Sequence, residues 1–166
     1  MSWFNRRSFM GFGLLMPLAL AACGFSPTLA PGSAAAGLQG KIRVADPTDK
    51  NGFDFLQHME ERLGRPEDPT YDLAYTITTA AIGVGINRQG EIQRYNLTGK
   101  IDWTLTRRAD QSRVTGGQAQ SFTSYSATGT TVAELSAERD AALRLMDILA
   151  DQIVIRLQAT APVWSK

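Results

Sequence analysis

The sequence predicts an α+β fold, a two-layer sandwich in which a mostly antiparallel sheet of about four strands carries two helices on one face. Between residues 71 and 125, apolar and polar side chains alternate with the period of two that is typical of half-buried strands. Residues 51–63 and 132–157 instead place apolar side chains at the spacing of amphipathic helices. Covering one face of a hairpin-built sheet with both helices is the economical arrangement.

The first strand and the first helix are expected between residues 41 and 64. Ile42 and Val44 alternate with charged residues in a short strand at 41–46, which Pro47 ends. The helix at 51–63 has Gly64 as its stop signal and four apolar residues at helical spacing: Phe55, Leu56, Met59 and Leu63. His58, the only histidine of the chain, falls within this helix and is expected to be solvated.

Three further strands are expected to follow as hairpins. The first runs from Tyr71 to about Ile86, and a turn at 87–90 leads into the clearest alternation of the chain. One face of that strand is apolar (Tyr95, Leu97, Ile101, Trp103 and Leu105), and the other is polar (Asn96, Thr98, Lys100, Asp102, Thr104 and Thr106). A second turn at 107–112 precedes a polar strand at 113–125. The pattern predicts one sheet face on the core and one open to water or a partner.

A long amphipathic helix is expected last, at 132–157. Its apolar residues recur at intervals of three, four or seven: Leu135, Ala142, Leu145, Met146, Leu149, Ile153 and Leu157. About 26 residues at 1.5 Å each give a helix of about 39 Å. The expected element order is therefore strand, helix, three strands, helix.

The only cysteine, Cys23, follows a segment with the features of a signal peptide. Arg6 and Arg7 form a short basic region, and the apolar stretch after them is about 12 residues, shorter than the ~20 that span a bilayer. Taken alone, Cys23 fits a free core thiol, a redox residue or a nucleophile that pairs with His58. However, residues 20–23 read Leu-Ala-Ala-Cys, the pattern of a bacterial lipobox, in which the cysteine receives a diacylglyceryl group.

We therefore predict a lipoprotein signal peptide at 1–22, a lipidated flexible tether at 23–40 and a single domain at 41–160. An ordinary secretory peptide with a bystander cysteine is the alternative. The tether is rich in Gly, Pro, Ala and Ser and carries no charge. The stretch "RRSFM" partly resembles a twin-arginine signal, but ordinary Sec leaders also contain paired arginines, so the export route stays open.

Composition and missing motifs argue against several classes of function. Without residues 1–22 the chain carries 15 basic and 16 acidic side chains, which lacks the basic excess of nucleic-acid-binding domains. The stretch "GVGINR" has Arg88 where a dinucleotide loop needs its third glycine. Zinc needs several His or Cys ligands, and only His58 remains if Cys23 is lipidated. We therefore expect no enzymatic activity, no cofactor, no metal and no nucleic-acid partner.

With these elements placed, the chain resembles the LPS-assembly lipoprotein family, LptE, over nearly all of its predicted mature part. The resemblance is carried by "CGFSP" at Cys23, "YNLTGKIDWTLTRR" in the central strand and "ERDAALRLMDILADQIVIRL" in the last helix. It implies an outer-membrane lipoprotein that faces the periplasm, sits within and stabilises an LptD-like β-barrel, and helps deliver lipopolysaccharide to the outer leaflet. It implies no catalysis.

Two alternatives have the same size and anchoring: an auxiliary lipoprotein of another lipid-trafficking transporter of the MCE type, and a generic adhesive or structural lipoprotein. Direct contact with lipopolysaccharide is a further hypothesis, because arginine binds phosphate through charge-assisted hydrogen bonds. Arg107, Arg108 and Arg113 flank the second turn and are candidates for one anionic contact site. Arg88 lies in the first turn, at the opposite end of the sheet. The competing interpretation is that all four arginines solubilise exposed turns.

Overall fold

A computed structural model describes residues 29–165, so the predictions for residues 1–22 and for Cys23 lie outside the described residues. The elements along the chain are η1 (Ala36–Leu38), β1 (Ile42–Val44), α2 (Lys50–Leu63), β2 (Tyr71–Ile86), β3 (Ile92–Arg107), β4 (Arg113–Ser126) and α3 (Thr131–Trp164). The four strands form one sheet in the order β1-β2-β3-β4. The predicted α+β class with a mostly antiparallel four-stranded sheet is confirmed.

The sheet is built on two long antiparallel ladders. β2 and β3 pair from Tyr71 with Arg107 to Ile86 with Ile92, and β3 and β4 pair from Arg94 with Ser126 onward. β1 pairs with β2 in parallel and only over three residues. A parallel pair needs a crossover connection, and α2 supplies it here.

Local signals set both ends of α2. The Asp49 carboxylate accepts a hydrogen bond from the Gly52 amide at 2.7 Å, which caps the helix, and Gly64 ends it with a left-handed φ of 76°. The expectation that His58 is solvated is wrong. Its side chain is 23% exposed and lies between Glu61 on its own helix and Asp147 on α3. Burial is the main cause that raises the pKa of Asp147.

The last helix is longer than predicted. It runs from Thr131 to Trp164, 34 residues, so it is about 51 Å long. It continues through Pro162, and Trp164 packs edge-on against Tyr71 of β2 with ring centroids 5.2 Å apart. This contact with the first residue of a core strand explains why the helix extends beyond Leu157, where the amphipathic pattern ends.

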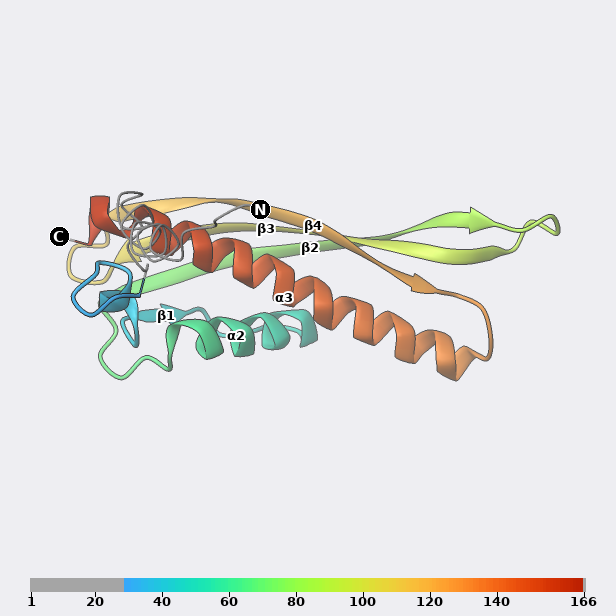
Figure 1. Ribbon diagram of the computed structural model, residues 1–166, viewed down its shortest axis with the longest axis horizontal. Coiled ribbons are helices and arrows are strands. Elements are labelled where there is room, and N and C mark those ends of the chain that lie inside the picture. The colour runs from blue at the N-terminus through green and yellow to red at the C-terminus, as the bar shows by residue number, and fades with distance from the viewer. Residues whose placement is uncertain (1–28, 166) are drawn as a thin grey trace, which may run out of the picture.

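The core lies between the helices and one face of the sheet, here called the covered face. The ring of Phe55 on α2 lies 4.7 Å from that of Tyr75 on β2. A Cβ added to Gly99 on β3 would lie 2.9 Å from the Leu145 side chain of α3. In Figure 1 both helices run along the same side of the sheet. Ala35 and Leu38, within the stretch predicted as a tether, are also buried, so packed structure begins before Lys41.

Candidate functional site: the open sheet face and the projecting hairpin

Among residues 29–165, no helix covers the opposite face of the sheet, here called the open face (Figure 1). By the registers of the two ladders, the following side chains of β2, β3 and β4 lie on this face: Ala74, Thr76, Thr78, Ala80, Asn96, Thr98, Lys100, Asp102, Thr104, Gln118, Gln120, Phe122 and Ser124. The central strand therefore shows the alternation that the sequence predicts. Its covered-face residues Leu97, Ile101, Trp103 and Leu105 are buried, whereas the polar residues between them are exposed or half-buried.

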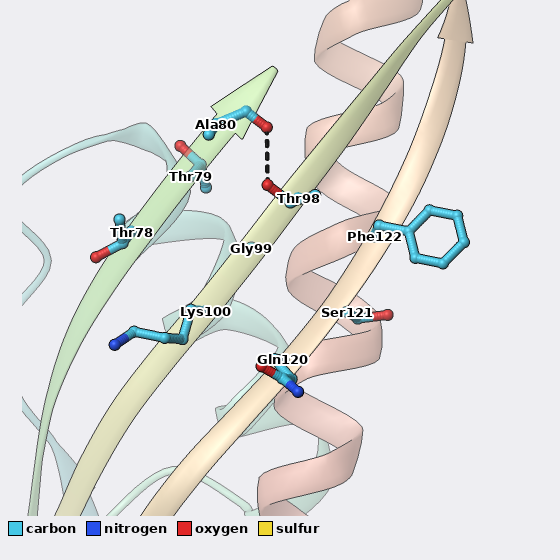
Figure 2. Close-up of a pocket in the computed structure, with 9 residues that line it drawn as sticks. All are labelled: Thr78, Thr79, Ala80, Thr98, Gly99, Lys100, Gln120, Ser121 and Phe122. Carbon is cyan, nitrogen blue, oxygen red and sulfur yellow. Dashed lines mark hydrogen bonds between the residues drawn. The ribbon is translucent and has the colours of Figure 1, made fainter. Parts of the chain in front are cut away.

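A shallow depression of about 460 Å³ lies in the middle of this face. Figure 2 shows it with α3 behind the sheet and with Phe122 standing away from β4. Phe122 is 62% exposed, and hydroxyl, amide and ammonium groups surround it. The Thr98 hydroxyl is tied down because it donates to the Ala80 carbonyl across the ladder at 3.0 Å. The depression thus combines one exposed aromatic side chain with a mainly apolar lining to which threonine, glutamine and lysine side chains add polar groups.

Pairs within β3 and between β3 and β4 order the polar side chains of the open face. Lys100 Nζ and Gln118 Nε2 each lie 2.8 Å from a carboxylate oxygen of Asp102. The bond from Lys100, followed by that from Gln118, lowers the pKa of Asp102. Farther along, the Ser124 hydroxyl donates to Asn96 at 2.7 Å. The face therefore presents charges of both signs and neutral polar groups, as a surface adapted to a polar partner does.

The distal part of β2 and β3 forms a hairpin that projects beyond β4 and α3 (Figure 1). Its tip is an ordered turn, because Asn87 Oδ1 accepts from the amides of Gln89 and Glu91 at 3.0 and 2.9 Å. Four large apolar side chains near the tip are exposed: Ile82, Val84, Ile86 and Ile92. These four side chains were not among the predicted site residues, although a signal for an uncovered hairpin was present: the strand pattern loses its large covered-face residues after Ile77.

The three predicted contact arginines lie at the other end of the sheet but on different faces. Arg107 donates to the Trp164 carbonyl of α3 at 3.4 Å, and Asp110 is 3.7 Å away. Arg108 lies 3.5 Å from Asp72, whose position is on the open face. Arg113 pairs with Thr106 on the open face and forms no salt bridge within residues 29–165. Arg88 is in the hairpin tip, at the opposite end, as expected.

No cluster of three His, Cys, Asp or Glu side chains suited to a metal ion occurs in the described part of the chain. Among the same residues, no helix has the length and apolar character required to cross a membrane.

Comparison with solved structures shows that this chain shares its fold with several bacterial lipoproteins. A putative lipoprotein from Caulobacter crescentus is 19% identical, with a TM-score of 0.65 over 78% of this chain and 96% of the other. The rare lipoprotein B of Shewanella oneidensis is 11% identical, with a TM-score of 0.55 over 74% and 95%. A minor lipoprotein from Acinetobacter baumannii is 15% identical, with a TM-score of 0.55 over 72% and 90%. A search of curated proteins finds no match.

The chain thus has an α+β fold that several bacterial lipoproteins share. The model of the lipopolysaccharide-assembly family LptE matches residues 40–157, and the chain belongs to this family. Membership makes it a lipoprotein of lipopolysaccharide assembly with a membrane-associated place in the cell envelope, in a family of accessory proteins without enzymatic activity.

Proposed function

We propose that this chain sits within an LptD-like outer-membrane β-barrel, stabilises it, and assists lipopolysaccharide assembly at the cell surface. The observation that carries the proposal is the open face, a polar sheet surface without a covering layer in a domain of the LptE family. The lumen of a large membrane barrel is polar. A surface of threonine hydroxyls, amides and paired charges is better suited to contact with such a wall than to contact with a lipid bilayer.

The anchor is the second part of the proposal. Residues 1–22 act as the signal peptide, Cys23 carries the lipid, and the uncharged residues that follow connect it to the domain. Each buried CH₂ contributes about 0.8 kcal/mol, so two or three acyl chains hold a protein durably at a membrane. Gly24 after the cysteine, in place of aspartate, is typical of lipoproteins that are sorted onward to the outer membrane.

Co-purification tests the partnership. The full-length chain is extracted in mild detergent from its own cells, and a large outer-membrane β-barrel protein should come down with it in near-equal amount. An auxiliary subunit of another lipid transporter would bring down a different set of proteins, and a structural lipoprotein would bring down none. Either result would contradict the barrel proposal.

Mass spectrometry tests the anchor. Cys23→Ala removes the only acyl acceptor, so the variant should remain an unprocessed or mislocalised precursor, while the domain melts at the same temperature as the wild type. A wild-type protein whose N-terminus begins at residue 23 without a lipid would refute lipidation.

Direct contact of the arginines with lipopolysaccharide remains our minor proposal, and their positions sharpen its test. A triple Arg107, Arg108 and Arg113→Gln variant should lose lipopolysaccharide binding while it keeps its melting temperature and its barrel partner. Because Arg107 faces α3 and the other two lie toward the open face, Arg108→Gln with Arg113→Gln should account for the loss, and Arg107→Gln alone serves as the matched control. Unchanged binding by the triple variant would place the contact elsewhere.

A further inference from the structure

The two edges of the sheet differ in how their main-chain groups are used. At the β4 edge, Arg156 NH1 donates to the Gln118 carbonyl at 3.4 Å, and Gln152 Nε2 donates to the Gln120 carbonyl at 3.3 Å. The Arg156 guanidinium lies so close over the strand that a Cβ on Gly117 would be 2.7 Å from it. Side chains of α3 therefore occupy two outward carbonyls in the middle of β4.

The β2 edge is free over most of its length. β1 pairs only with residues 71–73, and the last main-chain bond runs from the Ala45 amide to the Leu73 carbonyl at 2.9 Å. Main-chain groups alternate in direction along a strand, so those of Tyr75, Ile77, Thr79 and Ala81 point the same way as those of Tyr71 and Leu73, away from β3. Within residues 29–165, no other segment pairs with them.

The residues of this edge also lack the usual protection against strand addition. Natural edge strands carry lysines, prolines or inward charges that block pairing with another chain. Residues 73–86 contain no charged residue and no proline. An uncharged, extended and unpaired edge of this length is a template for an added strand.

A small hollow lies at the start of the free edge. It has a volume of about 230 Å³ and lies between the N-terminus of α2 and β2, lined by Thr48, Asp49, Gly52, Tyr75, Thr76 and Ile77. The Tyr75 hydroxyl is buried and has no hydrogen-bond partner in the described part of the chain. Burial, and next the charges of Asp49 and Asp46, raise the pKa of Tyr75, so its hydroxyl stays neutral and able to donate or accept. Asp49, which caps α2 and lines this hollow, and Asp46, which lies 3.7 Å from Arg43, are the acidic side chains whose charges act on Tyr75.

We propose that an extended segment of the barrel partner, carrying a lysine or arginine, adds to the β2 edge as a fifth strand beyond the end of β1. This inference rests on the proposed function above. The main chain of the added segment pairs with the outward groups of residues 75–81, and its cationic side chain approaches Asp46 and Asp49.

Charge and chain chemistry favour this occupant over two others. A second copy of β2 offers no cation between residues 73 and 86 to meet Asp46 and Asp49. The chain's own residues 24–33 contain no cation either, and Pro27 and Pro31 remove main-chain donors that a strand needs. A basic extended segment from another protein supplies both the cation and the main-chain donors.

The test uses a proline at one outward position. Thr79→Pro removes an amide that β3 does not use, so the fold should persist while strand addition at the edge is blocked. Thr131→Pro is the control, because it introduces a proline at the first position of α3, where the helix does not use the amide and proline is tolerated. The full-length variants are expressed in the native cells, and the barrel that co-purifies with each is quantified alongside the melting temperature.

We expect Thr79→Pro to reduce barrel recovery by about tenfold or more and Thr131→Pro to leave it unchanged, with both variants melting like the wild type. Hydrogen exchange on the wild-type complex supplies a readout that needs no variant. The amides of Tyr75, Ile77 and Thr79 should exchange rapidly in the free chain and slowly in the complex.

The failures are distinguishable. A wild-type chain that captures no barrel overturns the proposed function and this inference together. Equal barrel capture by Thr79→Pro, with rapidly exchanging amides in the wild-type complex, overturns only the inference. If the same amides are protected in the chain alone, and more so at higher protein concentration, the occupant of the β2 edge is a second copy of this chain and not a barrel segment.

Discussion

One β2–β3 ladder runs through two regions that are stabilised in different ways. Near its base, Leu73 and its partner Leu105 are 1% and 0% exposed beneath the helices. Toward its tip, Ile82 and Val84 on the same ladder are 53% and 49% exposed. The base is held by packing and the projecting hairpin by main-chain pairing and an ordered turn. A continuous ladder thus says little about how stability is distributed along it.

The residues of the covered face explain the boundary. At the base this face carries large apolar side chains, whereas beyond Ile77 the same positions of β2 carry Thr79, Ala81 and Gly83. Such small residues bury little apolar area, which stabilises by roughly 25 cal/mol per Å². The helices therefore have little to cover there, and the first ten residues of α3, 131–140, are not buried either.

The largest effects are expected in the base. Leu149→Ala and Trp103→Ala should each lower the free energy of unfolding by about 2 to 5 kcal/mol, because both side chains are buried and their removal leaves a cavity. Thermal or denaturant unfolding measures the change. A variant that melts like the wild type would show that the covered face is not the core of the domain.

A pair of glycines compares the two regions with one chemical change. Gly99→Ala should destabilise by about 1 to 3 kcal/mol, because the new Cβ meets buried Leu145 and Leu149 at 2.9 and 3.0 Å. Gly83→Ala brings its Cβ within 2.8 Å of Ile92, but that side chain is 37% exposed and free to move. The free energy of unfolding of Gly83→Ala should stay within about 0.5 kcal/mol of that of the wild type. Equal losses of unfolding free energy in the two variants would refute the distinction between a packed base and a loosely packed hairpin.

The smallest effect is expected from Ile82→Thr on the hairpin. Its free energy of unfolding should change by less than about 0.5 kcal/mol, since the side chain is already half exposed. Ile101→Thr, the same substitution at a fully buried position of the base, should cost about 1 to 3 kcal/mol because it also buries a hydroxyl. Chemical denaturation of the two variants side by side gives the comparison. A large loss for Ile82→Thr would mean that the hairpin is packed in solution.

Most of the sheet was predictable because its signals are local. The period-two pattern begins at Tyr71, and the turn around Asn87 separates β2 from β3, so these limits follow from neighbouring residues. The end of α3 was not predictable, because Trp164 extends the helix through a contact with Tyr71, a residue 93 positions earlier. The parallel pairing of β1 likewise depends on how α2 docks and not on the strand itself.

The division of the three arginines between two faces of the sheet was also not predictable from neighbouring residues. Arg113 has the same parity as Thr115, whose partner Leu105 is on the covered face. A bulge between Leu105 and Thr106 shifts the register by one residue and places Arg113 opposite Thr106 on the open face. No local residue signal marks this bulge, so the sequence predicted a cluster at the right end of the sheet without its division between faces.

The bonds from Gln152 and Arg156 to β4 also bear on growth of the sheet between molecules. Growth of a sheet into a polymer needs two open edges on every subunit, one that accepts the next chain and one that is accepted by it. Here two carbonyls of the β4 edge, those of Gln120 and Gln118, are already bonded from within the same chain. A strand that added at β4 would have to displace the side chains of Gln152 and Arg156, so growth of the sheet through this domain is disfavoured.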